Sequence, residues 1–208
     1  MKYENRWALI LTGIIILFFI IQNIIPWFTN LFILNSDLVF SRPWTLITSM
    51  FLHGSLIHLL LNGFALALFG SLLENILGSK KFLFLFFLTG LIANIPAFLF
   101  YKASLGASGA IFGVLGTLTV LRPNMTIWVS YMPMPMWIAA IVWALQDVFG
   151  ILAPSGIANL AHLGGLFAGL ILGFFYRKDH AKNRKKKNKD IMLSDDEIEE
   201  WERSNFKV

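Results

Sequence analysis

The chain has 208 residues, of which 57% are hydrophobic and only 14% charged, and its mean hydropathy is +0.68. Soluble domains usually carry about 25% charged residues. The charge is also uneven, because residues 177–208 hold 10 of the 17 Lys and Arg residues and 8 of the 12 Asp and Glu residues. Residues 1–176 hold only the remaining 11 charged residues, too few to cover the surface of a water-soluble globule. This excludes a soluble enzyme, a disordered chain and a fibrous repeat, and indicates a polytopic membrane protein.

Six apolar runs predict transmembrane helices, since about 20 apolar residues are needed to cross a bilayer. The runs cover residues 7–26, 54–73, 82–101, 104–121, 134–152 and 157–176. The first run has no small-residue cleavage site after it, so we interpret it as a retained span rather than a signal peptide. We therefore expect an all-α membrane core over residues 1–176 and a charged cytoplasmic tail over residues 177–208.

The distribution of basic residues predicts the orientation of the core. Six spans place both termini on one side, and 15 of the 17 Lys and Arg residues lie on that side. Only Arg42 and Lys102 lie on the other, so the termini are expected in the cytoplasm. The outer segment 27–53 is unusually apolar for a loop and is expected to be partly embedded in the membrane. The basic block 177–189 could also contact anionic lipid headgroups.

The net charge of +5 gives no reason to expect a nucleic-acid partner. The basic excess lies beside the last apolar run, where a positive cytoplasmic flank is expected in any case. Cysteine is absent, which excludes a disulfide, a thiolate nucleophile and a cysteine-ligated metal.

Polar residues recur at one depth of the predicted bundle. The second, fourth and sixth spans all start at the outer face, and their first one to two turns carry His58 and Asn62, Ser108, and Asn159 and His162 respectively. At 1.5 Å per residue, these side chains lie within about 12 Å of the outer helix ends. A lone membrane His or Asn usually only joins two helices. Their shared depth favours a functional site instead.

Glycines indicate which of these helices touch. They follow one face of the fourth span at Gly106, Gly109, Gly113 and Gly116, and recur every four residues in the sixth at Gly165, Gly169 and Gly173. Small residues at these spacings let two helix backbones approach closely. We therefore expect these two spans to pack together and to bring Ser108 within reach of His162. Because a hydroxyl is a poor nucleophile until a base takes its proton, this pair predicts nucleophilic catalysis by serine.

The same positions could stabilise an oxyanion. Ser108 lies at a helix N-terminus, where backbone N–H groups lack intrahelical partners, and His58 and Asn62 add side-chain donors. No carboxylate neighbours His162 in the sequence, so we expect a Ser–His dyad rather than a triad. Asp147, in the fifth span, is the only acidic residue that could approach the histidine from another part of the chain, but we expect it to be an interface residue rather than its partner.

Two competing functions have less support. His53, His58 and His162 could supply imidazole ligands to a metal, but the sequence has neither an HExxH pattern nor a carboxylate near them. A small transporter would be expected to show an internal repeat and charged residues at the membrane midplane, and the sequence shows neither convincingly.

Three motifs, in this order and spacing, strongly resemble the rhomboid family of intramembrane serine proteases. They are HGSLIHLLLN over residues 53–62, GASG over 106–109 and AHLGG over 161–165. The resemblance covers about residues 40 to 176. It implies a six-helix core and cleavage of transmembrane protein substrates near the outer membrane face.

The resemblance also implies roles for individual residues. Ser108 matches the nucleophile and His162 the general base, while His58 and Asn62 match the side chains of the oxyanion hole. Phe112 falls where the family places an aromatic ring against the catalytic histidine.

Glu74 matches a structural glutamate of the family at the inner end of the second helix. One position departs from the family pattern. Many members carry Trp-Arg before the second helix, whereas Trp44 is followed here by Thr45. The nearest arginine is Arg42, whose role the sequence leaves open.

The alternative within the same fold is a catalytically silent rhomboid-like protein that binds membrane clients. The intact serine, histidine and oxyanion-hole candidates argue against it. The expected partners are transmembrane protein substrates and membrane lipid, with no nucleic acid, cofactor or metal. The short core, the absence of a presequence and the basic tail favour a prokaryotic plasma membrane.

Overall fold

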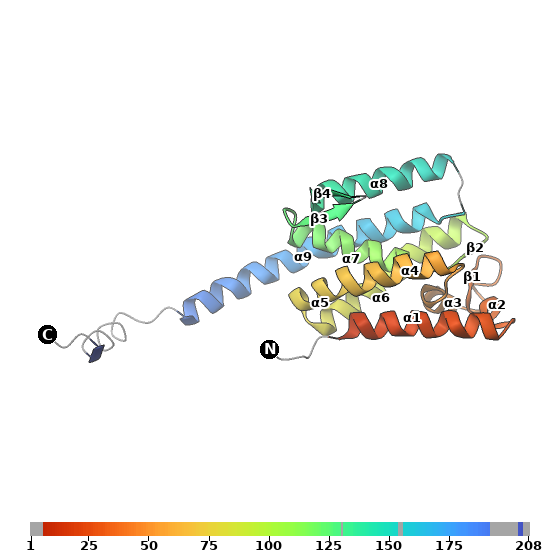
Figure 1. Ribbon diagram of the computed structural model, residues 1–208, viewed down its shortest axis with the longest axis horizontal. Coiled ribbons are helices and arrows are strands. Elements are labelled where there is room, and N and C mark those ends of the chain that lie inside the picture. Colours follow the sequence, from red (N-terminus) through yellow and green to blue (C-terminus); the bar gives the residue numbers. More distant parts are fainter. Residues whose placement is uncertain (1–5, 130, 154–155, 192–203, 206–208) are drawn as a thin grey trace. The chain divides into compact units, whose positions relative to one another are not determined.

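The computed structural model describes residues 6–129, 131–153, 156–191 and 204–205. The chain divides into two compact units, Met1–Phe174 and Phe175–Val208. The described part of the first unit is a bundle of helices with two small two-stranded sheets (Figure 1). The helices and strands of the described chain are, in order, α1 (Trp7–Ile24), α2 (Phe28–Phe32), β1 (Leu34–Asn35), α3 (Thr45–Thr48), η1 (Ser49–Phe51), α4 (Leu56–Ala65), η2 (Leu66–Gly70), α5 (Ser71–Leu77), α6 (Ser79–Phe100), β2 (Ala103–Ser104), α7 (Ser108–Leu121), β3 (Thr126–Val129), β4 (Met132–Pro135), α8 (Met136–Leu152) and α9 (Asn159–Ile191), of which α9 begins in the first unit and continues into the second.

Within the described residues, four helical stretches are long and apolar enough to cross a membrane, so the chain is an integral membrane protein. They are Trp7–Ile24, Leu56–Leu77, Ser79–Phe100 and Asn159–Lys178. The other two predicted spans correspond to α7 and α8, which are apolar but shorter. Their crossing of the membrane stays a prediction.

Helix α7 forms the core of the bundle. Most of its residues are buried, and apolar or small side chains cover its whole circumference, as expected of a helix surrounded by others. It packs against α6 and contacts α4, and Figure 1 shows it in the middle of the bundle.

The predicted glycine faces of α7 and α9 meet in the structure. A Cβ atom on Gly165 would collide with the backbone carbonyl oxygen of Gly109, and one on Gly169 would collide with that of Gly113. The Thr117 hydroxyl also donates a hydrogen bond across the interface to the Gly169 carbonyl, at 2.9 Å. Only glycine permits this backbone-to-backbone approach, which fixes the height of α9 relative to α7.

Side chains from the second half of the first loop hold the end of α2. The last carbonyls of a helix have no intrahelical partner. Here three consecutive ones accept side-chain hydrogen bonds: Asn30 O from Arg42 Nη1 at 3.1 Å, Leu31 O from Trp44 Nε1 at 3.2 Å, and Phe32 O from Thr48 Oγ1 at 2.9 Å. This gives Arg42 a structural role, which is to fold the loop on itself.

The first loop also supports the segment that leads into α7. Strand β1 pairs with β2 in antiparallel register, with Leu34 opposite Ser104. Two residues later, the Gly106 N–H donates to the Ser49 carbonyl at 2.9 Å. Backbone hydrogen bonds therefore hold the chain on the N-terminal side of Ser108.

Glu74 is fully buried and holds the start of α1. Its two carboxylate oxygens accept hydrogen bonds from the backbone N–H groups of Trp7, at 3.1 Å, and Ala8, at 3.0 Å. The Ser79 hydroxyl donates to the same carboxylate at 2.7 Å. The carboxylate thus satisfies unpaired N–H groups at the positive end of the α1 dipole, although it belongs to a distant part of the chain.

We expect Glu74→Gln to lower the free energy of unfolding by about 1.5–3 kcal/mol, because it weakens charge-assisted hydrogen bonds at a buried site. The measurement is reversible unfolding in detergent micelles. The exposed neighbour offers a control, since Asn75→Ala should leave the unfolding free energy within about 0.5 kcal/mol of the original. Equal stability of the Glu74→Gln variant and the original protein would contradict this role.

Candidate active site

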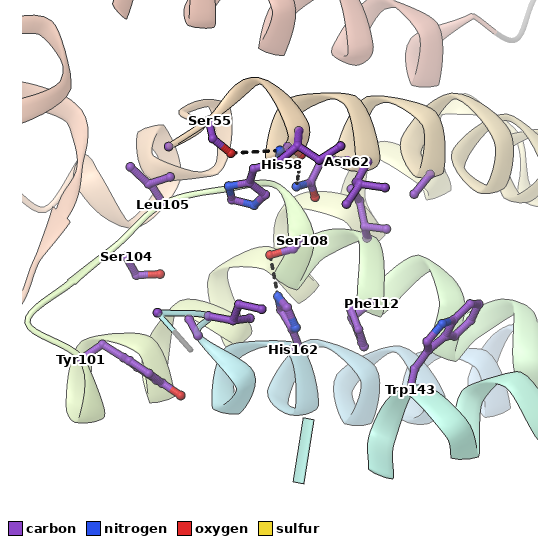
Figure 2. A pocket seen from close by; sticks show the side chains of 18 of the residues that line it. Ser55, His58, Asn62, Tyr101, Ser104, Leu105, Ser108, Phe112, Trp143 and His162 are labelled. Atoms are coloured by element: carbon purple, nitrogen blue, oxygen red, sulfur yellow. Dashed lines mark hydrogen bonds between the residues drawn. The ribbon is translucent and has the colours of Figure 1, made fainter. Parts of the chain in front are cut away.

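Ser108 and His162 come together at the ends of two helices. Ser108 is the first residue of α7, and His162 lies in the first turn of α9. The serine Oγ is 2.8 Å from His162 Nε2, which is hydrogen-bond distance (Figure 2). The Phe112 ring stacks on the imidazole, with centroids 4.4 Å apart and planes 11° from parallel. The imidazole is thus held on its face by an aromatic ring and at one edge by the hydroxyl.

Glycine is required at position 106 for two reasons. Its φ is +123°, a conformation that other residues rarely adopt. A Cβ atom there would also lie 2.8 Å from His58 Cε1 and 2.9 Å from its Nε2. The backbone just before Ser108 therefore lies directly against the His58 ring.

His58 and Asn62 approach the serine from the other side. Both belong to α4, and Figure 2 shows them across Ser108 from His162. Asn62 is buried, and its Nδ2 donates to the His58 carbonyl at 2.9 Å. A carboxamide nitrogen carries two hydrogens, so this bond fixes the Asn62 side chain and leaves it a second donor.

The expectation for Asp147 was wrong. Its Oδ1 lies 3.0 Å from His162 Nδ1, on the side of the ring opposite Ser108, and the residue is only 5% exposed. A carboxylate therefore does stand beside the histidine, although 15 residues separate the two in the sequence. The reason is that α8 runs in the direction opposite to that expected for α4, α7 and α9, so Asp147 reaches this depth near the end of its helix and not near the start. Asp147 is five residues from the end of α8, or about 8 Å, which places it near the depth of His162.

His53 contributes a neutral imidazole rather than a charge. Burial and, to a smaller extent, the neighbouring His58 lower its pKa to about 4. The two rings meet edge to face at a centroid distance of 5.0 Å. In the described ranges, no group of three or more His, Cys, Asp or Glu side chains is arranged to hold a metal.

Ser108, His162, His58 and Asn62 line a cavity of about 830 Å³. Ser108 and His162 form part of its wall, and apolar residues of α4, α7 and α8 form much of the rest. Tyr101, at the end of α6, also lines it, and its hydroxyl accepts a hydrogen bond from the Leu160 N–H at 3.2 Å. Sequence reasoning missed this support for the start of α9, because the two residues lie 59 positions apart in the chain.

A family profile described as Rhomboid domain matches residues 41–179, about two thirds of the chain. The chain belongs to the rhomboid family. Among similar proteins, RHOMBOID-like protein 6, mitochondrial, of Arabidopsis thaliana is 37% identical over 64% of this chain and 44% of its own length. Two proteins of Bacillus subtilis (strain 168) also match. The putative rhomboid protease YdcA is 31% identical over 81% of this chain and 85% of its own, and the rhomboid protease GluP is 35% identical over 65% and 26%.

The matched part of this rhomboid chain spans less than half the length of the first plant relatives. It spans most of the Bacillus protein YdcA. The relatives include proteins named as proteases and others named only as rhomboid-like. Membership of the family therefore does not decide whether this chain is a protease, and its activity must be inferred from its own residues.

Proposed function

We propose that this chain is an intramembrane serine endopeptidase that cleaves transmembrane protein substrates near the outer membrane face. The observation that carries the proposal is the 2.8 Å contact between Ser108 Oγ and His162 Nε2 at the wall of the cavity. A hydroxyl in contact with an imidazole, inside a pocket large enough for a peptide segment, is the arrangement that acyl transfer requires.

In this mechanism His162 takes the proton of Ser108 as Oγ attacks the carbonyl carbon of the scissile bond. The same proton then passes from Nε2 to the departing amide nitrogen, which leaves an acyl group on the serine. A water molecule deprotonated by His162 hydrolyses this ester and restores the hydroxyl. The imidazole acts as base and acid in turn, so its fixed position between Phe112 and Ser108 is essential.

The negatively charged oxygen that forms on the attacked carbonyl at each step needs hydrogen-bond donors. The backbone N–H of Ser108 lies at the positive end of α7, where N–H groups have no intrahelical acceptor. His58 and the second hydrogen of the Asn62 amide approach the serine from the opposite side. A correctly aimed donor of this kind is worth about 2.7–4 kcal/mol to the transition state.

The substrate must expose a carbonyl that an intact transmembrane helix hides. A helix satisfies all its carbonyls internally, so the segment that enters the cavity must unwind first. We therefore expect Gly, Ala or Pro near the scissile bond, because glycine lowers the cost of unwinding, proline breaks the helix, and alanine adds little side-chain bulk beside the carbonyl.

We further propose that α7 and α8 also cross the bilayer, giving six spans with both termini in the cytoplasm. The distribution of basic residues supports this orientation. Exposed aromatic side chains of the first loop, such as Phe40 at 88% exposure, support a loop that is partly embedded in the membrane. We also propose a prokaryotic plasma membrane as the location, with residues 177–208 as a charged cytoplasmic tail whose basic residues fit the inner face.

A fluorophosphonate probe tests the proposed function. The purified protein in liposomes should be labelled at Ser108, and mass spectrometry should find one main cut in a generic transmembrane substrate near its outer end. Folded protein that is neither labelled nor active would contradict the protease and would indicate a silent rhomboid-like protein that binds membrane clients.

The orientation can be tested by labelling single introduced cysteines, because the chain contains no cysteine of its own that would react. The exposed positions Asp37 and Lys80 belong to predicted outer and inner segments. In intact cells, an impermeant maleimide should label Asp37→Cys, whereas Lys80→Cys should react only after lysis. The reverse pattern would overturn the proposed topology.

A further inference from the structure

Asp147, His162 and Ser108 form a continuous series of contacts across three helices. The carboxylate Oδ1 is 3.0 Å from His162 Nδ1, and His162 Nε2 is 2.8 Å from Ser108 Oγ. The two contacts use opposite nitrogens of one ring. The three residues come from α8, α9 and α7, so only the folded bundle assembles them.

The carboxylate determines which nitrogen of His162 carries hydrogen. An ionised carboxylate only accepts hydrogen bonds, so the contact requires the hydrogen on Nδ1. A neutral imidazole has one N–H, which leaves Nε2 with a free lone pair facing the Ser108 hydroxyl. This is the tautomer that a general base needs.

The surroundings of Asp147 distinguish it from a structural carboxylate. Glu74 is also buried, but both of its oxygens accept backbone N–H groups at a helix terminus. In contrast, Asp147 Oδ2 is buried without a hydrogen-bond partner in the part of the chain that the structure describes. A buried carboxylate is costly unless it is paired, and His162 is the partner that the structure gives it.

We propose that Asp147 is a positioning residue that extends the Ser108–His162 pair to a Ser–His–Asp relay. This inference rests on the proposed protease function. When Oγ attacks, the O–H bond of Ser108 breaks and its proton joins Nε2, which makes His162 an imidazolium. Asp147 stays ionised, holds the Nδ1 hydrogen and stabilises the new positive charge. The proton then leaves Nε2 for the departing nitrogen, and the charge on the ring disappears.

Ring orientation is thereby fixed in two independent ways. Phe112 stacks on the face of the imidazole and sets its plane, while Asp147 holds one edge and sets its rotation within that plane. His58 is also titratable, but it belongs to α4 on the far side of Ser108, and an imidazole brings no negative charge. Asp147 therefore supplies the negative charge at the imidazole.

The test compares Asp147→Asn and Asp147→Ala with the original protein in liposomes. We expect kcat for cleavage of a transmembrane substrate to fall by at least about 100-fold in both variants. The rate constant for fluorophosphonate labelling of Ser108 should fall in parallel. KM should stay within about threefold, because Asp147 does not line the cavity. The Asn variant has nearly the same shape as the original residue, so its melting temperature should be unchanged.

Asp37→Asn is the matched control, since it makes the same chemical change at an exposed position of the first loop. It should leave kcat, labelling rate and melting temperature unaltered. Ser108→Ala separates the two proposals: if it retains activity, the protease mechanism itself fails. If Ser108→Ala is inactive but Asp147→Asn keeps kcat within about threefold, only the relay is overturned. A loss in Asp147→Asn that follows a raised KM or a lowered melting temperature would assign the residue to packing and would also overturn it.

Discussion

Replacement of Ser108 by alanine is expected to abolish proteolysis while the protein stays folded. The hydroxyl is the atom that forms the covalent intermediate, and alanine fits the same place without it. Loss of a serine nucleophile or of its histidine typically lowers kcat by about 10⁴- to 10⁶-fold. His162→Ala should be equally inactive, and the double variant no worse, because the two residues act as one unit. Cleavage of a transmembrane substrate in liposomes measures the effect.

The cavity provides a matched control for this substitution. Ser104 also lines the cavity, four residues before Ser108, and Figure 2 shows its side chain away from the His162 ring. Ser104→Ala should therefore cut the substrate at close to the original rate. Cleavage that survives Ser108→Ala would contradict the assignment of the nucleophile, whatever the behaviour of the control.

A valine at position 169 is expected to damage both stability and activity. Its Cβ would collide with the backbone carbonyl of Gly113, which cannot rotate away as a side chain could. The two helices must then separate, which we expect to lower the free energy of unfolding by about 3 kcal/mol or more. His162 would move with α9, and a displacement of about 1 Å costs about 100-fold in rate. Unfolding in micelles and the cleavage assay measure the two effects.

Gly13 offers the same substitution at an open site. It lies on α1, and a Cβ atom there would meet nothing within 4 Å. Gly13→Val should leave the rate unchanged and the unfolding free energy within about 0.5 kcal/mol. If Gly169→Val behaved like this control, the close contact between α7 and α9 would not be what positions the histidine.

Local pattern was sufficient to predict much of the bundle. Apolar runs predicted where the long helices lie, because a helix that crosses a bilayer needs about 20 apolar residues and each segment shows this composition by itself. The glycine spacing predicted the contact of α7 with α9, since backbone approach depends on which residues lack a side chain. The shared depth of Ser108 and His162 followed from the same reasoning, and the structure brings these two side chains into contact.

Other features could not be read in this way because their partners are remote in the chain. The length of the first loop gave no sign that Arg42 and Trp44 hold consecutive carbonyls of α2. The hydrogen bond from the Leu160 N–H to the Tyr101 hydroxyl likewise joins residues 59 positions apart.

By itself, the sequence determined a membrane-embedded helical chain with a serine and a histidine on two glycine-lined helices. Hydropathy and glycine spacing are properties of single segments, so no fold is needed to see them. The tertiary structure alone decided that a carboxylate stands behind the imidazole. The direction in which Asp147 points depends on how α8 is rotated about its own axis when it packs on the bundle. The residue pattern within α8 or α9 alone does not specify that rotation.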